Sequence, residues 1–195
     1  MTRSDSVSGL LAQIADVGRD PRRGGYTRPG WSGHEATLRE WFTGEVASRG
    51  LGVTTDRNGI VWAWWNPHGL PLRDAVLTGS HLDSVPGGGA FDGPLGVASA
   101  LVALDLLRDR DVDPVRPLAI AVFPEEEGSR FGVACLGSRL LTGAIEPAAA
   151  AALTDRDGVT FGQALGASPA GRLPELSSRP SGPASAPPRT ERRSP

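Results

Sequence analysis

Two patterns of apolar residues alternate along the chain, and together they predict strands and amphipathic helices. Residues 75–78 and 117–123 are short β-branched and apolar runs, which predict two buried strands. Residues 58–65 are dense in Val and Trp and end in a turn at residues 66–69, which predicts a further strand. These runs indicate a sheet at the centre of the fold.

Apolar positions at helical spacing predict four helices between and around these strands. Ser32 and Glu35 have the spacing of a capping box, and Pro94 suits the first position of a helix. The helix that starts at Pro94 is apolar nearly all round, so we expect it to be buried against the sheet. The sequence therefore predicts an α/β fold, a twisted mixed sheet with helices on both faces. The predicted helices span residues 4–17, 32–48, 94–108 and 133–141.

Composition limits the class of protein. The chain has 195 residues, of which 39% are hydrophobic, enough for the core of one domain. It contains no run of 18 apolar residues and no apolar signal-peptide core at its start, so we expect no membrane span and a cytoplasmic location. Its single cysteine, Cys135, gives no disulfide framework and is expected to be a small buried residue. A net charge of −2 gives no reason to expect nucleic acid as a partner.

The last part of the chain differs from everything before it. Residues 168–195 are rich in Pro, Ser and Arg, with Leu173 and Leu176 as their only large apolar residues. Such a segment cannot offset the entropy of ordering, so we expect a folded part at residues 1–167 and a disordered tail. The abrupt change suggests a reading-frame shift or a premature end, and a basic interaction tail is the alternative.

Chemistry-bearing side chains follow the first predicted strand. His81 and Asp83 come directly after residues 75–78, at the carboxyl end of a strand, where open α/β sheets bind their ligands. Alternate residues of a strand share a face, and a carboxylate two residues after a histidine can orient a metal-binding imidazole. A glycine-rich loop at residues 87–89 can then return Asp92 to the same place. A simple hydrogen bond between His81 and Asp83 at the strand end is the alternative.

Three consecutive acids follow the second predicted strand. Glu125, Glu126 and Glu127 repel one another and are costly to bury without a cation. A solvated acidic turn is the alternative for an isolated run. Together with the histidine and two aspartates at the other strand end, however, the acids favour a metal site. Carboxylate and imidazole without thiolate suit zinc or manganese.

At this point the sequence resembles a known family. The segments GSHLDSVPGGGAFDGPLGV (residues 79–97) and FPEEEGSRFGVACLGSRLLTG (residues 123–143) are similar to the dinuclear-metal amidohydrolases. This group includes allantoate amidohydrolase, N-carbamoyl-L-amino-acid hydrolase and β-ureidopropionase, within the wider aminoacylase and carboxypeptidase-like metallopeptidases. The resemblance extends to about Ala167 and covers the N-terminal part of such a protein only.

The resemblance implies a role for each of these residues. His81 would bind one of two divalent ions, Zn or Mn, and Asp92 would bridge both. Glu127 would bind the other ion and Glu126 would be the general base, while Asp83 would orient the imidazole. Glu125 receives no role and is expected to be solvated.

The resemblance also implies a function and its alternatives. It points to a hydrolase that acts on the linear amide or ureido C–N bonds of allantoate or N-carbamoyl-L-amino acids, and to a homodimer in full-length members. Those members supply further histidine ligands and a dimerisation domain that nothing in this chain matches, so we expect this truncated chain to be inactive by itself. The alternatives are an aminoacylase or dipeptidase-like metallopeptidase, and a catalytically silent fragment or binding module.

Overall fold

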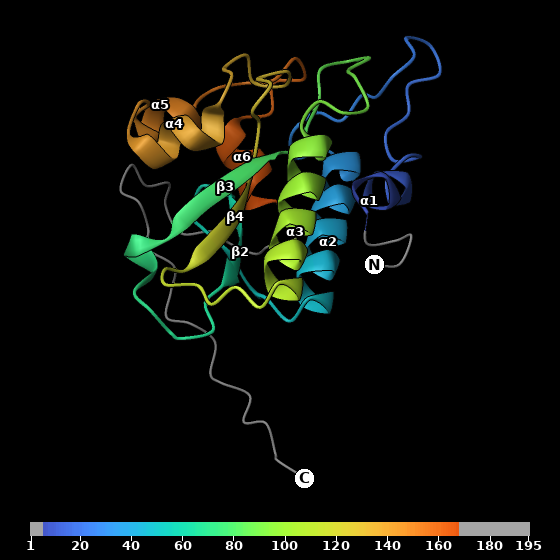
Figure 1. Ribbon diagram of the computed structural model, residues 1–195. Helices are drawn as coiled ribbons and strands as arrows, with labels where there is room; N and C mark the ends of the chain where they lie inside the picture. The colour runs from blue at the N-terminus through green and yellow to red at the C-terminus, as the bar shows by residue number, and fades with distance from the viewer. Residues whose placement is uncertain (1–5, 168–195) are drawn as a thin grey trace.

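A four-stranded mixed sheet lies at the centre of the computed structural model, which describes residues 6–167 (Figure 1). Its strands run in the order β1-β2-β4-β3. The β1–β2 and β2–β4 pairs are antiparallel, and β3 pairs with β4 in parallel. The mixed α/β fold predicted from the sequence is therefore confirmed. The strands are β1 (Gly52–Thr55), β2 (Val61–Trp65), β3 (Val76–His81) and β4 (Leu118–Phe123).

The helices form two groups around this sheet. In Figure 1, α1, α2 and α3 stand to the right of the strands, and α4 and α5 lie to their upper left. A short 3₁₀ helix, η2 (Leu72–Asp74), precedes β3. The helices are α1 (Val7–Gln13), α2 (Gly33–Ser48), α3 (Pro94–Asp109), α4 (Leu136–Thr142), α5 (Pro147–Ala151) and α6 (Phe161–Gly166).

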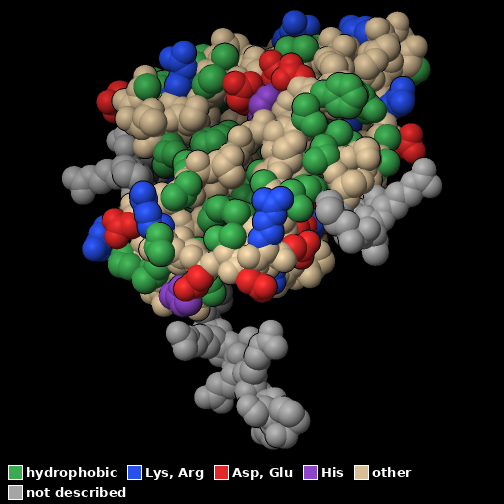
Figure 2. Space-filling model, viewed as in Figure 1, with side chains coloured by type: hydrophobic (Ala, Val, Ile, Leu, Met, Phe, Trp, Pro, Cys, Tyr) green, Lys and Arg blue, Asp and Glu red, His purple; other side chains and the backbone are tan. Residues whose placement is uncertain are grey.

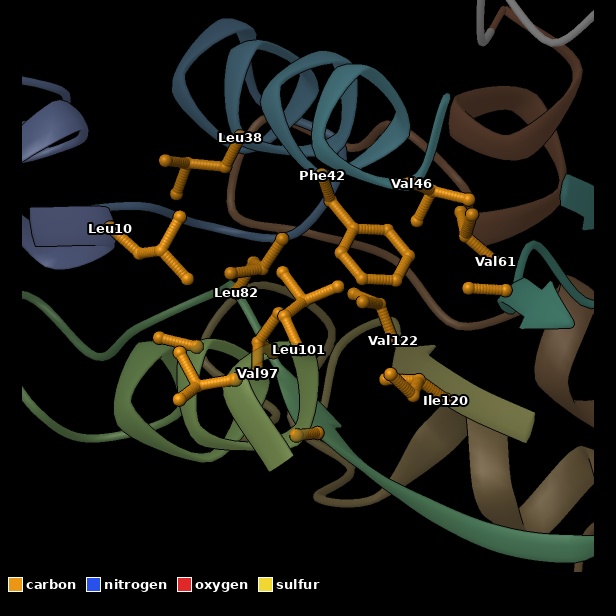
Figure 3. Close-up of a cluster of buried hydrophobic side chains, with 14 of the residues drawn as sticks. Leu10, Leu38, Phe42, Val46, Val61, Leu82, Val97, Leu101, Ile120 and Val122 are labelled. Carbon is orange, nitrogen blue, oxygen red and sulfur yellow. The ribbon is translucent and has the colours of Figure 1, made fainter. Parts of the chain in front are cut away.

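The main core fills the space between the sheet and the first three helices. Phe42 of α2 points between Leu101 of α3 and Val122 of β4, and all three side chains are fully buried (Figure 3). Alternate residues of β4 face this core, as the period of a strand requires. A second, smaller apolar cluster joins α4, α5 and α6 around Phe161.

The ends of the long helices follow the predicted signals, with one correction. Pro94 occupies the first turn of α3, and the Ser32 side chain accepts the N–H of Glu35 at the start of α2. The return bond of a capping box is missing, because the buried Glu35 carboxylate accepts the N–H of Trp31 and pairs with Arg39 instead. The predicted start of the helix is therefore confirmed, but only one of the two bonds of a capping box forms.

Strand β3 also differs from the prediction. Residues 75–78 were expected to form a buried strand, yet Val76 and Leu77 are 49% and 48% exposed. The reason is its position, because β3 is the edge strand of the described sheet and pairs with β4 alone. Burial begins only at its last residue, His81.

Two further expectations concern the chain as a whole. Among the helices of residues 6–167, none has the length and apolar content needed to cross a bilayer. The tail predicted at residues 168–195 lies outside the described residues.

Candidate metal centre

The parallel pairing of β3 with β4 brings the two predicted site segments together. His81 lies opposite Phe123 in the register, so the C-terminal ends of the two strands lie side by side. The chain after β4 then enters the acidic run, and the chain after β3 enters the loop that leads to Asp92 and α3. Figure 2 shows acidic side chains gathered beside a histidine near the top of the face in view.

The imidazole of His81 is held by its own segment of chain. Its Nδ1 lies 3.0 Å from the main-chain oxygen of Asp83, to which it can donate a hydrogen bond. That bond leaves the lone pair of Nε2 free. The Nε2 atom lies 3.4 Å from Oε2 of Glu126 and 3.6 Å from Oδ1 of Asp92. Gly93 makes this arrangement possible, because a Cβ at that position would lie 2.7 Å from the imidazole ring.

Asp83 acts mainly on the acidic run. Its carboxylate is 1% exposed, and its two oxygens accept the backbone N–H groups of Glu126 at 3.2 Å and Glu127 at 3.1 Å. The nearer contact to His81 comes from the Asp83 main chain, while the carboxylate is 3.6 Å from Nδ1. Burial raises the pKa of Asp83 to about 7, against the lowering effect of His81 and the two N–H groups.

Asp92 lies close enough to Glu127 for its charge to act on that carboxylate. The Asp92 side chain is 62% exposed, whereas Oε1 of Glu127 is buried without a hydrogen-bond partner among the described residues. Burial raises the pKa of Glu127, and the negative charge of Asp92 raises it further. A cation beside Glu127 would offset the burial and the negative charge that disfavour its ionised form.

Glu126 contacts a residue whose role the sequence did not reveal. The Cys135 Sγ lies 3.3 Å from Oε1 of Glu126, which leaves Oε2 directed at His81. Cys135 was expected to be a buried small residue, but it is only partly buried and stands just before α4 with a φ of 58°. Burial and then Glu126 raise the pKa of its thiol.

The burial of Glu125 contradicts the prediction for this residue. It was expected to be solvated, and its side chain is 0% exposed. Its Oε1 accepts the backbone N–H groups of Arg130 and Phe131, each at 2.8 Å. Burial raises the pKa of Glu125, and these two hydrogen bonds oppose that shift. No signal in the acidic run itself separates Glu125 from the two residues that follow it.

The donor set suits a divalent cation in chemical type. One imidazole nitrogen and the carboxylates around it are the ligands that zinc and manganese use. The unpartnered oxygen of Glu127 and the Nε2 lone pair of His81 both remain available for such an ion. Within residues 6–167, however, no group of three or more His, Cys, Asp or Glu side chains is close enough to enclose a metal. These residues therefore have the chemistry that a divalent cation requires. A complete coordination shell needs movement of these side chains or further ligands.

A cavity of about 940 Å³ lies elsewhere, between the start of α2, the β1–β2 edge and α6. Trp31, Arg39 and Arg130 are among its lining residues, and none of the predicted metal-site residues is. The candidate metal-site residues therefore lie beyond the C-terminal ends of β3 and β4, outside this cavity.

Comparisons with known proteins agree with the motifs. The sequence profile described as peptidase family M28 matches residues 61–164. The chain is 37% identical over 158 residues to ureidoglycolate hydrolase of Arabidopsis thaliana, across 80% of this chain and 33% of that protein. It is 33% identical to N-carbamoyl-L-amino acid amidohydrolase of Geobacillus stearothermophilus, across 92% of this chain and 44% of the relative. It is 32% identical to allantoate amidohydrolase of Escherichia coli, across 82% of this chain and 38% of that protein.

Solved structures show the same likeness. The crystal structure of a hydantoinase/carbamoylase family amidase from Burkholderia ambifaria superposes with a TM-score of 0.79 at 35% sequence identity. The match covers 88% of this chain and 41% of the amidase. The chain thus spans between a third and under half of the length of the proteins it matches.

Proposed function

Because the chain belongs to peptidase family M28, we propose that it carries part of the catalytic site of a metal-dependent hydrolase of amide or ureido C–N bonds. One observation supports this above all. The parallel strands β3 and β4 end together, so the free Nε2 of His81 faces the carboxylates of Asp92 and Glu126 at 3.4–3.6 Å. At this separation His81 and Asp92 can share a cation, and Glu126 lies close enough to act on a water beside it.

We propose that His81, Asp92 and Glu127 would hold two divalent ions, zinc or manganese. When bound, such ions polarise a carbonyl and lower the pKa of water. The main-chain oxygen of Asp83 holds His81 in the tautomer that leaves Nε2 free for an ion. The Asp83 carboxylate holds the backbone of Glu127 in place.

Glu126 is the proposed general base. Its Oε2 is directed into the site, while Oε1 is engaged by the Cys135 thiol, so one oxygen remains to accept a proton. It would take the proton of a water that attacks the carbonyl carbon, and would then pass that proton to the departing nitrogen as the C–N bond breaks. A single carboxylate thus carries the proton from the attacking water to the departing nitrogen.

The substrate class follows from the relatives. Ureidoglycolate, allantoate and N-carbamoyl amino acids, as the names of the three relatives state, share a linear ureido group. We therefore propose a small ureido or amide substrate. The family profile itself is described as a peptidase family, which supports cleavage of short peptides as the second candidate.

The first test measures metal binding by the chain of residues 1–195. Titration calorimetry with Mn²⁺ or Zn²⁺ should show weak but saturable binding, because catalytic zinc normally has three protein ligands and the residues available here must serve two ions. Glu127→Gln should weaken binding at least about tenfold, as expected when a ligand is lost. Glu126→Gln should change it less than about threefold if Glu126 takes a proton and binds no ion.

Two results would contradict these assignments. Equal loss of binding in both variants would make Glu126 a ligand, and unchanged binding in Glu127→Gln would remove Glu127 from the site. For the substrate, we expect no measurable turnover by this chain alone. Release of ammonia from allantoate by the chain would refute that expectation, and cleavage of dipeptides in preference to ureido compounds would favour the peptidase alternative.

A further inference from the structure

The first acid of the run Glu125–Glu127 has no place in the proposed chemistry, yet it is the most deeply buried of the three. Its side chain is 0% exposed at the end of β4, and its φ of 50° lies in the left-handed region. A buried carboxylate costs free energy unless its oxygens accept hydrogen bonds. The environment of Glu125 must therefore offset both burial and an unusual backbone conformation.

The partners of Glu125 are backbone groups of its own loop. Its Oε1 accepts the N–H groups of Arg130 and Phe131, so the carboxylate closes residues 125–131 into a ring. Within this ring stand Glu126 and Glu127. Their position relative to β4 is thus fixed by a bond that reaches five and six residues ahead.

A distant segment closes over the buried carboxylate. A Cβ at position 30 would collide with Oε2 of Glu125, so the close approach requires a glycine there. The Arg130 guanidinium donates to the main-chain oxygen of Gly30 at 2.9 Å and pairs with Asp155 at 2.9 Å. The loop is therefore also held by the segment that precedes α2 and by Asp155.

Asp83 holds the same loop through a second pair of hydrogen bonds. Its carboxylate accepts the N–H groups of Glu126 and Glu127, as described above. The two acids of the site thus stand between two buried carboxylates, each of which binds two backbone N–H groups. Loss of either should let the loop move relative to His81.

We propose that Glu125 is a positioning residue of this centre, which sets the acidic loop so that Glu126 and Glu127 reach His81 and Asp92. The expected effect of Glu125 on metal binding rests on the proposed function. The expected effect of Glu125 on the position of the loop concerns the metal-free chain alone. The two parts can be tested separately.

Asp56 provides a matched control. It is a mostly buried carboxylate in the turn between β1 and β2, and it accepts the backbone N–H groups of Asn58 and Ile60. It has no contact with the acidic loop or His81 among its hydrogen bonds. Asp56→Ala therefore removes the same kind of interaction at a distance from the site.

The experiment compares Glu125→Ala, Glu125→Gln and Asp56→Ala in the full chain. Amide hydrogen exchange measured by NMR without metal should show the N–H groups of Glu126 and Glu127 exchanging at least about tenfold faster in Glu125→Ala, with no such change in Asp56→Ala. The Gln variant keeps one carbonyl oxygen for both N–H groups and should restore rates to within about threefold of wild type. Mn²⁺ affinity should fall about 10–100-fold in Glu125→Ala alone.

Each outcome decides the matter. Unchanged exchange at Glu126 and Glu127 in Glu125→Ala overturns the inference, as does an equal effect from Asp56→Ala, which would mean general destabilisation. If wild type binds no Mn²⁺, the proposed function fails, and exchange alone decides the positioning role. If Glu125→Ala does not fold, Glu125→Asp replaces it, because the shorter carboxylate cannot reach both N–H groups and should show the same local acceleration.

Discussion

Replacement of Gly93 by alanine is the most direct way to disturb the candidate centre without removing one of its functional groups. Gly93 precedes α3 with a φ of 84°, and its missing side chain leaves room for the imidazole of His81. An added Cβ would lie 2.7 Å from Cε1 and Nδ1 of His81 and 2.6 Å from its main-chain oxygen. Ordinary contacts begin near 3.4 Å, so His81 or α3 must move by about 0.7 Å.

Two terms contribute to the cost of Gly93→Ala. The backbone conformation of Gly93, with φ 84° and ψ −67°, costs an alanine about 1–3 kcal/mol. Overpacking against His81 adds about 1–3 kcal/mol, the range for inserted atoms in packed sites. The total loss of unfolding free energy should therefore be about 2–6 kcal/mol.

Gly158 separates these two terms. It has a φ of 78°, and an added Cβ there would meet nothing within 4 Å, so Gly158→Ala carries only the cost of a positive φ, about 1–2 kcal/mol. Urea unfolding of both variants gives the difference, and Mn²⁺ titration shows whether His81 has moved. Equal destabilisation by the two substitutions, or unchanged metal affinity in Gly93→Ala, would refute the argument that Gly93 makes room for His81.

Two further predictions concern stability. Phe42→Ala should lower the unfolding free energy by about 3–5 kcal/mol in urea titrations, because its ring is fully buried between α3 and β4; a loss below 1 kcal/mol would mean that the core collapses around the gap. Burial raises the pKa of Asp56, so the native state holds this proton more tightly than the unfolded chain, and stability should fall as pH rises above the unfolded value of about 4. Asp56→Asn should make that decline above pH 4 shallower, and an identical slope would exclude Asp56 as a cause.

Elements whose signal is local could be predicted from the sequence. The helix at α3 was expected from Pro94 and its apolar positions, and the strand at β4 from its uniformly apolar run. The four-residue strand β1 and the helix α6 were missed. Strand β1 is short and only half-buried, and α6 has its signal in a capping box of Thr160 and Gln163 that the Ala-rich stretch before it obscured.

Burial proved harder to predict than secondary structure. The apolar run at β3 has the composition of a central strand, but exposure depends on which strands lie beside it, and within the described sheet β3 has one neighbour. The same limit applies to the candidate site. The sequence placed His81 and Asp92 near the acidic run, because both segments follow strands that lie side by side. The choice of Glu127 within that run came from the family resemblance. The sequence could not show that the Asp83 main chain, rather than its carboxylate, makes the nearer contact to the imidazole.

The run Glu125–Glu127 shows why such details are hidden in a sequence. Three identical side chains occupy three different environments: one is buried under Gly30, one faces His81, and one lies near Asp92. The difference arises from backbone conformation, since the left-handed φ of 50° at Glu125 turns its side chain away from the two that follow. The partner that permits this burial is a glycine far earlier in the chain. An acidic run at a strand end can therefore combine a positioning acid with functional ones, and only the packing partners tell them apart.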